Sequence, residues 1–178
     1  MQFKQVRAIE PTCGAYDCMV KYAEAVAAKK NAARAREESR LHREAKAKIK
    51  TRQQWMGEAQ AAFNRWIRAR DAGLPCISCG RHHQGQWHAG HYRSVGSNPA
   101  LRFDPANVHK QCQPCNTHLS GNAIEYRIGL VARIGLAEVE RLEGQQEPKK
   151  YMIGDLQDLK RKYNSLAREL EKKNLQND

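Results

Sequence analysis

Four cysteines, arranged in two closely spaced pairs, constrain the fold of this chain more than any other feature of its sequence. Each pair has the pattern C-x2-C, and 32 residues separate Cys76 and Cys79 from Cys112 and Cys115. A C-x2-C turn can present two thiolates to one ion, and tetrahedral zinc takes four ligands. The intervening residues include few large apolar side chains, so metal binding would supply much of their folding free energy, on the order of 10–16 kcal/mol for a structural zinc site. We therefore predict that these four cysteines bind structural zinc.

The rest of the sequence favours zinc over a disulfide or a redox pair. Residues 1–7 lack the apolar run of a secretory signal, and no apolar run approaches the ~20 residues that span a membrane. We therefore expect a soluble cytoplasmic protein, in which paired cysteines typically bind metal. A redox C-x2-C is typical of a βαβ context, which this sequence lacks, and buried thiols without metal are the remaining alternative.

Two helical segments precede the cysteine-rich region. Residues 1–50 form a basic N-terminal extension, and from Cys18 to Lys50 they are rich in strong helix formers with no glycine or proline. Few large apolar residues occur there, so we expect a long exposed helix. Residues 51–73 begin with T-R-Q-Q, which fits a capping box, and continue with apolar residues at three- and four-residue steps. They predict an amphipathic packing helix in which the tryptophans are structural.

The cysteine-rich module covers residues 74–144 and is followed by one more helix. Its last part, from Ala123 onwards, has helical periodicity that we expect to be interrupted at Gly129 or Gly135. After a break, residues 151–178 predict a C-terminal amphipathic helix.

Positive charge is concentrated in the first two-thirds of the 178-residue chain. Residues 1–122 hold 20 basic and 9 acidic side chains, whereas residues 123–178 hold 11 and 10. This asymmetry, within a total net charge of +12, favours a polyanion such as nucleic acid as the partner. An acidic membrane surface is less favoured, because no helix combines this charge with a strongly apolar face. Arg34 and Arg36, in the basic segment, are candidate DNA contacts.

A zinc ribbon requires only its four ligands, yet residues 74–122 also hold six of the seven histidines. His88 and His91 lie between the cysteine pairs, Asn107 follows, and Asn116 comes directly after the last cysteine. Each has a simpler explanation: His91 as a core histidine, His88 as a surface histidine, and Asn116 as a helix N-cap. The remaining histidines are expected to contact solvent or phosphate, namely His82, His83, His109 and His118.

This order of residues resembles an HNH (ββα-metal) endonuclease. In that fold a strand carries a metal ligand and a general-base histidine, an asparagine pins the following loop, and a helix brings further metal ligands. Asn116 also resembles the metal-binding asparagine of phage Holliday-junction resolvases of the endonuclease VII type. The resemblance implies a mostly α chain with a small α+β, zinc-bound HNH module between the basic N-terminal helix and the C-terminal amphipathic helix.

A more specific resemblance covers roughly residues 50–170. It is carried by L-P-C-I-S-C-G from residue 74, A-G-H-Y-R from 89, L-R-F from 101, H-K-Q-C from 109, C-N from 115 and S-G-N from 120. These motifs resemble the NinG (Rap) recombination protein family of lambdoid phages. The resemblance implies a structure-specific endonuclease on branched DNA such as Holliday junctions, D-loops and forks, acting in the cytoplasm of a bacterial host. A non-catalytic zinc-ribbon DNA-binding protein is the main alternative, and a helical adaptor that zinc holds together is a weaker one.

The resemblance assigns roles to individual residues. His91 would be the general base, and Asn107 would position it by tying the loop. His88 and Asn116 would hold a catalytic Mg²⁺ or Mn²⁺, with His118 as a reserve ligand. Phosphate contacts would come from basic residues of the module, namely Arg93, Arg102 and Lys110. Symmetric cutting of a four-way junction calls for two active sites, so we expect a homodimer. Phage or host recombination proteins are further candidate partners.

Two departures from the family pattern bear on these roles. The family has an acid three residues before the general-base histidine, and here that residue is His88. Imidazole also binds divalent metals, so the metal preference would change while the site is retained. The N-terminal cysteine cluster of the family is reduced to Cys13 and Cys18, so we expect that zinc finger to be lost or completed by a partner.

Overall fold

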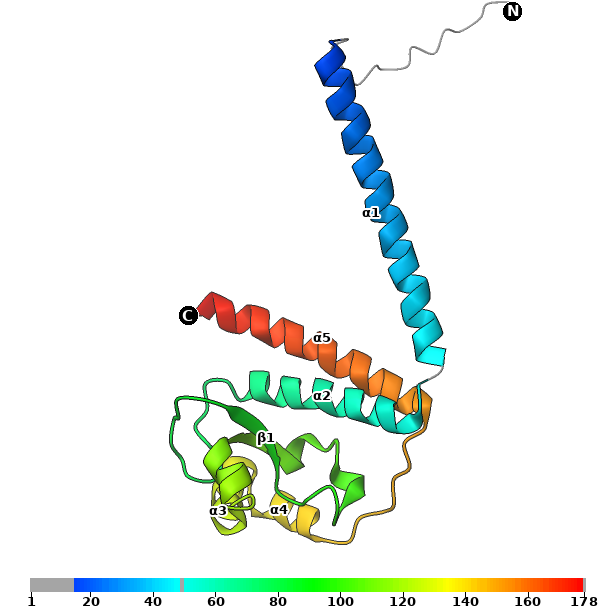
Figure 1. The fold of residues 1–178 in the computed structure, drawn as a ribbon. Coiled ribbons are helices and arrows are strands. Elements are labelled where there is room, and N and C mark those ends of the chain that lie inside the picture. Colours follow the sequence, from blue (N-terminus) through cyan, green and yellow to red (C-terminus); the bar gives the residue numbers. More distant parts are fainter. Residues whose placement is uncertain (1–14, 49, 178) are drawn as a thin grey trace, which may run out of the picture. The chain divides into compact units, whose positions relative to one another are not determined.

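The first of two units in the chain contains one long helix. In a computed structural model, which describes residues 15–48 and 50–177, the chain divides into Met1–Lys50 and Thr51–Asp178. Helix α1 spans Tyr16–Lys48 and buries none of its residues, which confirms the long exposed helix (Figure 1). Cys18 lies in this helix, whereas Cys13 lies outside the described residues.

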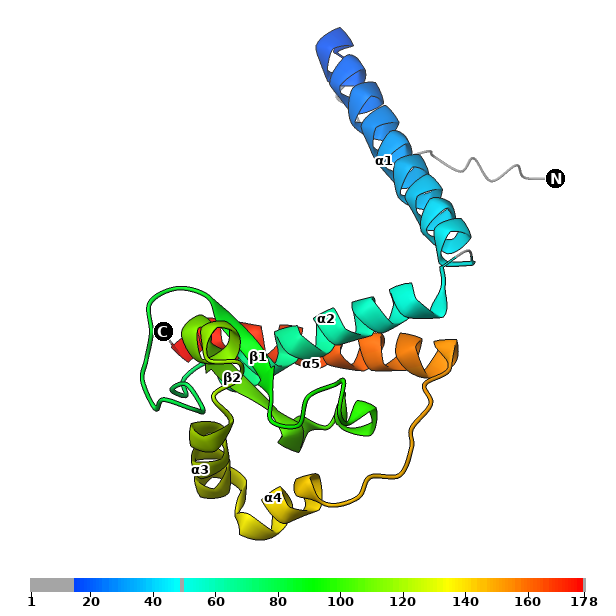
Figure 2. The same ribbon diagram turned by 60° about the horizontal axis from the view of Figure 1, so that its bottom comes forward.

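The second unit is framed by two parallel helices, α2 (Arg52–Arg70) and α5 (Ile153–Asn177). The predicted capping box starts α2, since the Thr51 hydroxyl accepts from Gln54 N and the Gln54 side chain accepts from Thr51 N. Ion pairs join Glu58 to Lys160 and Arg65 to Glu171, so the two helices run in the same direction (Figure 2). The two helices pack against each other, and their buried apolar residues are Trp55, Ala59, Ala62, Phe63, Ile67, Leu156, Tyr163 and Ala167.

A two-stranded antiparallel sheet lies against α2. Strand β1 (Trp87–His91) pairs with β2 (Val108–Cys112), so that His88 is opposite Gln111 and His91 is opposite Val108. Short turns of helix fill the connections: η1 (Pro99–Leu101) and η2 (Pro105–Asn107) precede β2, and the π-type turn η3 (Pro114–His118) follows it. The described chain is thus mostly helical with one small sheet, as predicted.

Helices α3 (Ala123–Ile134) and α4 (Leu136–Glu143) follow the sheet. The predicted interruption falls at Gly135, whose φ of +83° suits glycine. The two helices enclose a second core with the first cysteine turn, formed by Ile77, Leu101, Tyr126, Leu130, Val139 and Leu142. Across residues 15–48 and 50–177, no helix has the length and apolar character needed to cross a membrane.

Gly129 lies inside α3 and serves helix packing. A Cβ at this position would lie 2.0 Å from the backbone oxygen of Ile77, in the first cysteine turn. Because backbone atoms on both sides form this contact, neither can move away cheaply. Gly129 therefore allows α3 to approach the cysteine turn.

We expect Gly129→Ala to lower the free energy of unfolding by about 1–3 kcal/mol, as overpacking of a filled core does. Gly57→Ala is the matched control, because Gly57 is an exposed position of α2 with no atom within 4 Å of the new Cβ. That change should stabilise the helix by about 0.5–1 kcal/mol. Denaturant unfolding monitored by circular dichroism measures both, and equal effects of the two substitutions would contradict the packing role.

Candidate functional site

The two cysteine pairs converge on one point. The Sγ atoms of Cys76, Cys79, Cys112 and Cys115 all lie within 4.8 Å of one another, and Cys79 Sγ is 4.0 Å from Cys112 Sγ. Four sulfurs bound tetrahedrally at about 2.3 Å from zinc are about 3.8 Å apart, so a small contraction would close the set. The four cysteines could therefore bind a metal such as zinc.

Hydrogen bonding and burial shift the pKa values of these thiols in opposite directions. Burial raises the pKa of Cys76, but the amides of Cys112, Cys79 and Ser78 outweigh it, so that the pKa is lowered overall. Burial raises the pKa of Cys112 to about 12. His83 Nε2 lies 3.1 Å from Cys79 Sγ, so this histidine contacts a thiol instead of the expected solvent or phosphate. A cation bound among the sulfurs would offset the cost of burial at Cys112 and favour its thiolate.

Asp71 fastens the strands to α2. Its buried carboxylate, 2% exposed, accepts from the Arg70 guanidinium and from the backbone N–H of Lys110, 2.9 Å away. Burial alone raises the pKa of Asp71, but Arg70 and the Lys110 amide lower it more. Arg133 of α3 approaches the same carboxylate at 3.8 Å. Sequence reasoning missed this residue, although a carboxylate directly after a helix of strong basic character was a usable signal.

Lys110, which was predicted to contact phosphate, is buried between β2 and the end of α2. It is 5% exposed, its ammonium donates to Ala72 O at 2.6 Å, and it lies 4.3 Å from the centre of the Trp87 ring. A cation held in this way stabilises the sheet against the end of α2. Lys110 is therefore a structural lysine and is removed from the predicted DNA contacts.

His91 lies at the end of β1 with one ring nitrogen engaged. Its Nε2 is 3.0 Å from Arg102 O, and because a carbonyl only accepts, Nε2 carries the proton. The lone pair of the neutral ring is therefore on Nδ1. Burial lowers the pKa of His91, which keeps the ring neutral near pH 7.

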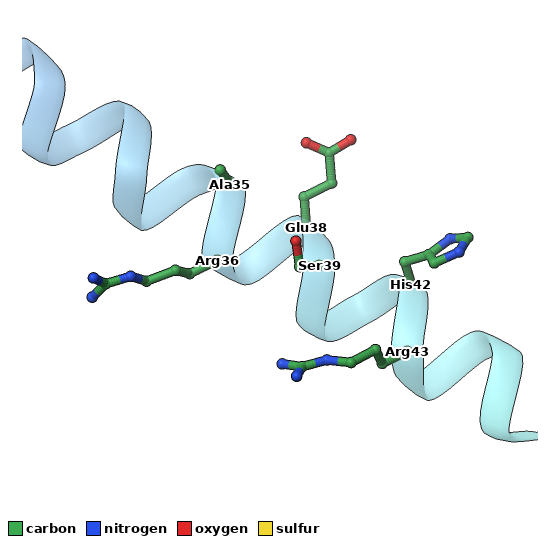
Figure 3. A pocket seen from close by; sticks show the side chains of 6 residues that line it. All are labelled: Ala35, Arg36, Glu38, Ser39, His42 and Arg43. Atoms are coloured by element: carbon green, nitrogen blue, oxygen red, sulfur yellow. The ribbon is translucent and has the colours of Figure 1, made fainter. Parts of the chain in front are cut away.

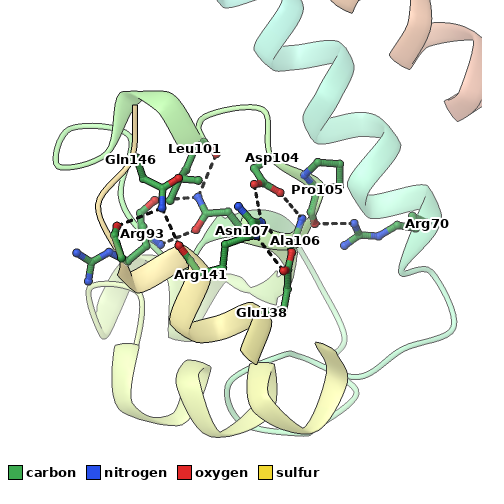
Figure 4. A network of polar contacts seen from close by, with 11 residues as sticks. Arg70, Arg93, Leu101, Asp104, Pro105, Ala106, Asn107, Glu138, Arg141 and Gln146 are labelled. Carbon is green, nitrogen blue, oxygen red and sulfur yellow. Dashed lines mark hydrogen bonds and ion pairs between the residues drawn. The ribbon is translucent and has the colours of Figure 1, made fainter. Parts of the chain in front are cut away.

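Asn107 ties both ends of the loop between the strands. This asparagine is 0% exposed. Its Oδ1 accepts from Arg93 N at 2.8 Å, and its Nδ2 donates to Arg93 O and Leu101 O at 3.0 and 3.2 Å. Figure 4 shows these bonds converging on the asparagine, beside the ion pair of Arg141 with Asp104. The Leu101 bond fixes the residue that precedes Arg102, whose carbonyl accepts from His91.

His88 and Asn116 form a contact on the other face of β1. Residues three apart on a strand point to opposite faces, and His88 is accordingly opposite Gln111 whereas His91 is opposite Val108. Asn116 Nδ2 lies 2.8 Å from His88 Nδ1. Asn116 lies within η3, in which Gln113 occupies the N-cap position, so the N-cap alternative is not seen. The structure thus brings together the two residues predicted as metal ligands, while His118 is exposed.

The four arginines predicted to contact DNA have three kinds of surroundings. Arg102 Nη1 donates to Gln60 of α2 at 3.2 Å, and burial lowers the pKa of Arg102. Arg93 is half-buried, and its Nε finds no hydrogen-bond partner in the described part of the chain. Arg34 and Arg36 are exposed on α1. An open hollow beside Arg36 is lined by α1 residues alone (Figure 3), so it is no candidate pocket.

His109 is a core residue, contrary to the expectation of a solvent or phosphate contact. It is 3% exposed, and its ring meets that of Tyr126 edge-on at 6.4 Å. Burial lowers its pKa to about 3, so the ring is neutral at physiological pH. Tyr126 in turn donates to Gly90 O at 2.8 Å and supports β1 between the two candidate histidines. His82 is exposed, as expected.

Comparison with known proteins reveals one family. A family model described as "Bacteriophage Lambda NinG protein" matches residues 2–174. The ninG protein of Salmonella phage P22 is 43% identical over 122 residues, which is 68% of this chain and 60% of that relative. The ninG proteins of Escherichia phage lambda and Escherichia phage 933W show the same identity over 60% and 61% of their lengths. The chain thus spans about 60% of the length of these relatives. No solved structure matches it significantly.

We expect the purified protein to contain about one tightly held zinc ion per chain. Cys76→Ser and Cys112→Ser should each release it and unfold residues 74–122, because the binding free energy of the ion is also folding free energy. Cys18→Ser, in the exposed helix α1, is the control and should retain the metal. Elemental analysis combined with circular dichroism measures both effects. A folded wild-type sample without metal would overturn the prediction.

Proposed function

The chain belongs to the NinG family of bacteriophage proteins, and on that premise we propose that it is a metal-dependent, HNH-like endonuclease that cuts branched DNA during phage recombination. The observation that carries the proposal is the arrangement of polar residues around β1. His91, half-buried and held through Nε2 by the Arg102 carbonyl, lies on one face with Nδ1 as its acceptor nitrogen, and the contacting pair of His88 and Asn116 lies on the other. A structural zinc ribbon needs neither feature.

In this proposal His91 activates the attacking water. Nδ1 takes a proton from water, the water oxygen forms a bond to phosphorus, and the bond from phosphorus to the 3′ oxygen breaks. Arg102 O accepts from Nε2–H throughout and stabilises the imidazolium that forms. Asn107 acts as a positioning residue, because it holds the loop that carries this carbonyl.

A divalent ion would be held by His88 and Asn116. His88 Nδ1 and Asn116 Nδ2 lie 2.8 Å apart, so the two side chains together would offer an imidazole nitrogen and an amide oxygen to an ion. When bound there, such an ion would supply charge stabilisation to the phosphate and to the leaving oxygen. The cysteine-bound zinc would serve the fold alone.

The charge distribution supports DNA as the partner. Arg93 and Arg102 adjoin the proposed catalytic residues, and α1 adds the exposed Arg34 and Arg36. Two copies would place two active sites on a four-way junction, so the proposal includes a homodimer. Phage or host recombination proteins in the bacterial cytoplasm are its further candidate partners.

Cleavage distinguishes this proposal from a non-catalytic DNA-binding protein. On a labelled four-way junction, with Mg²⁺ or Mn²⁺, we expect the wild type to nick and His91→Ala to lose about 10²–10⁴-fold in rate while retaining zinc and DNA affinity. His82→Ala, at an exposed histidine outside the proposed catalytic and metal-binding residues, is the control and should cut normally. A wild type that binds junctions but never nicks them would favour the zinc-ribbon alternative.

The pH dependence of the same assay identifies the base. Because burial lowers the pKa of His91 from 6.5, the neutral form persists to lower pH than in an exposed histidine. The loss of kcat/KM on the acidic side of the pH profile should therefore occur at pH values below about 6.5. An acidic limb well above that value would exclude His91 in this role.

Salt dependence tests the contribution of α1 to DNA binding. Arg34→Gln combined with Arg36→Gln should flatten the plot of log affinity against log salt by about 0.9 for each phosphate that is no longer neutralised. Arg40→Gln is the control, since its guanidinium is already paired with Glu37 and Glu44 at 2.5 and 2.6 Å. Fluorescence anisotropy with a labelled junction measures the slopes. Equal slopes for the wild type and the double variant would show that these arginines do not contact DNA.

A further inference from the structure

One buried polar atom beside the proposed metal ligands has no partner. Gln111 is 0% exposed, and its Oε1 has no hydrogen-bond partner among the described residues. Its Nε2 donates to Ser78 Oγ and to Gly121 O, both at 2.7 Å. Because a carbonyl only accepts, the Gly121 bond fixes the orientation of the amide and leaves Oε1 pointing the other way. A buried acceptor without a partner costs free energy, so its orientation calls for an explanation.

The Gln111 oxygen lies close to Gly90, which the Asn116 oxygen also approaches. A Cβ built on Gly90 would lie 2.1 Å from Gln111 Oε1 and 3.1 Å from Asn116 Oδ1, and these two distances limit the separation of the oxygens to about 5.2 Å. Any side chain at position 90 would fill the space that the Gln111 oxygen occupies. The glycine therefore leaves room for an amide oxygen from the neighbouring strand.

His88 completes this group. It is directly opposite Gln111 in the sheet, so the two side chains leave on the same face, and its Nδ1 contacts the Asn116 amide at 2.8 Å. One imidazole and the amide side chains of Gln111 and Asn116 thus lie on that face of β1, close to Gly90. In the described part of the chain, the four cysteines are the one group of three or more histidine, cysteine or acidic side chains that could hold a metal, so this second group contains no carboxylate cluster.

We infer that Gln111 Oε1 is a third ligand of the catalytic divalent ion, in an uncharged ligand set with His88 and Asn116. This inference rests on the proposed function. A cation in this place would give the Gln111 oxygen its missing partner, which explains why Nε2 faces Ser78 and Gly121. The set neutralises none of the charge of the ion, so binding should strengthen when a phosphate group supplies negative charge. Imidazole also suits Mn²⁺ better than Mg²⁺, which prefers oxygen ligands.

Direct titration of the zinc-loaded, full-length protein with Mn²⁺ tests the assignment. Electron paramagnetic resonance of free Mn²⁺ gives the affinity without any need for activity, and Mn²⁺ is too weak a competitor to displace zinc from four thiolates. We expect Gln111→Met to weaken Mn²⁺ binding by at least about tenfold, as loss of a supporting group at a metal site typically does. Gln113→Met makes the same chemical change two residues away, outside this group, and should bind Mn²⁺ like the wild type.

A second variant and a second measurement test the same assignment if Gln111→Met fails to fold. Gly90→Ala keeps Gln111 but displaces its oxygen, so it should weaken Mn²⁺ binding as much, with zinc content unchanged. In the wild type, Mg²⁺ added with a short DNA duplex should shift the ¹³Cδ resonance of Gln111 and leave that of Gln113 in place.

The outcomes distinguish a failure of the Gln111 assignment from a failure of the proposed function. Wild-type protein that binds no Mn²⁺, with or without DNA, would overturn the catalytic metal and the proposed function together. Wild-type binding that Gln111→Met or Gly90→Ala leaves unchanged, or an unshifted Gln111 ¹³Cδ signal, would overturn the Gln111 ligand and leave the proposed function standing.

Discussion

The geometry of the small sheet depends on the convergence of four cysteine sulfurs within 4.8 Å. Cys112 ends β2 and Cys115 lies in the turn that follows, so the same cluster fixes the end of one strand and the position of η3. Asn116, the next residue, is thereby held against His88. A structural metal on the cysteines would therefore set the distance between the two residues proposed to hold the catalytic ion, although it takes no part in the chemistry. The dependence is physical: a two-stranded sheet is marginal by itself.

Local patterns in the sequence predicted the helices and the cysteine cluster. They did not predict which distant residues surround a particular side chain. The capping box at Thr51, the long basic helix and the cysteine pairs are short-range signals, and the structure has all three elements. Lys110 was predicted to contact phosphate, yet its ammonium lies against the Trp87 ring and donates to Ala72 O. No local pattern encodes that contact, because it joins a strand to the end of a helix 38 residues earlier.

The candidate site shows the same limit. The histidines and asparagines could be singled out by residue type and order, and their opposite faces followed from the period of a strand. Gln111 could not, because its importance comes from the register that sets it opposite His88 and from the absence of a side chain at Gly90. Gly129 is similar, since only the approach of α3 to Ile77 explains it. The sequence thus predicts which chemical groups are present, whereas the strand register decides which of them meet.

The loop between the strands shows how an irregular segment can position a proposed base. Asn107 Nδ2 donates to Leu101 O, and the next carbonyl, that of Arg102, accepts from His91. The ring orientation of His91 is therefore fixed through the loop instead of by a neighbouring side chain. Farther along the same loop, Asp104 pairs with Arg141 of α4 at 2.8 Å, and at the loop's beginning Tyr92 donates to Glu143. Helix α4 contributes no residue to the proposed chemistry, yet it holds both parts of the loop, so changes on its surface would reach His91 through the Arg102 carbonyl.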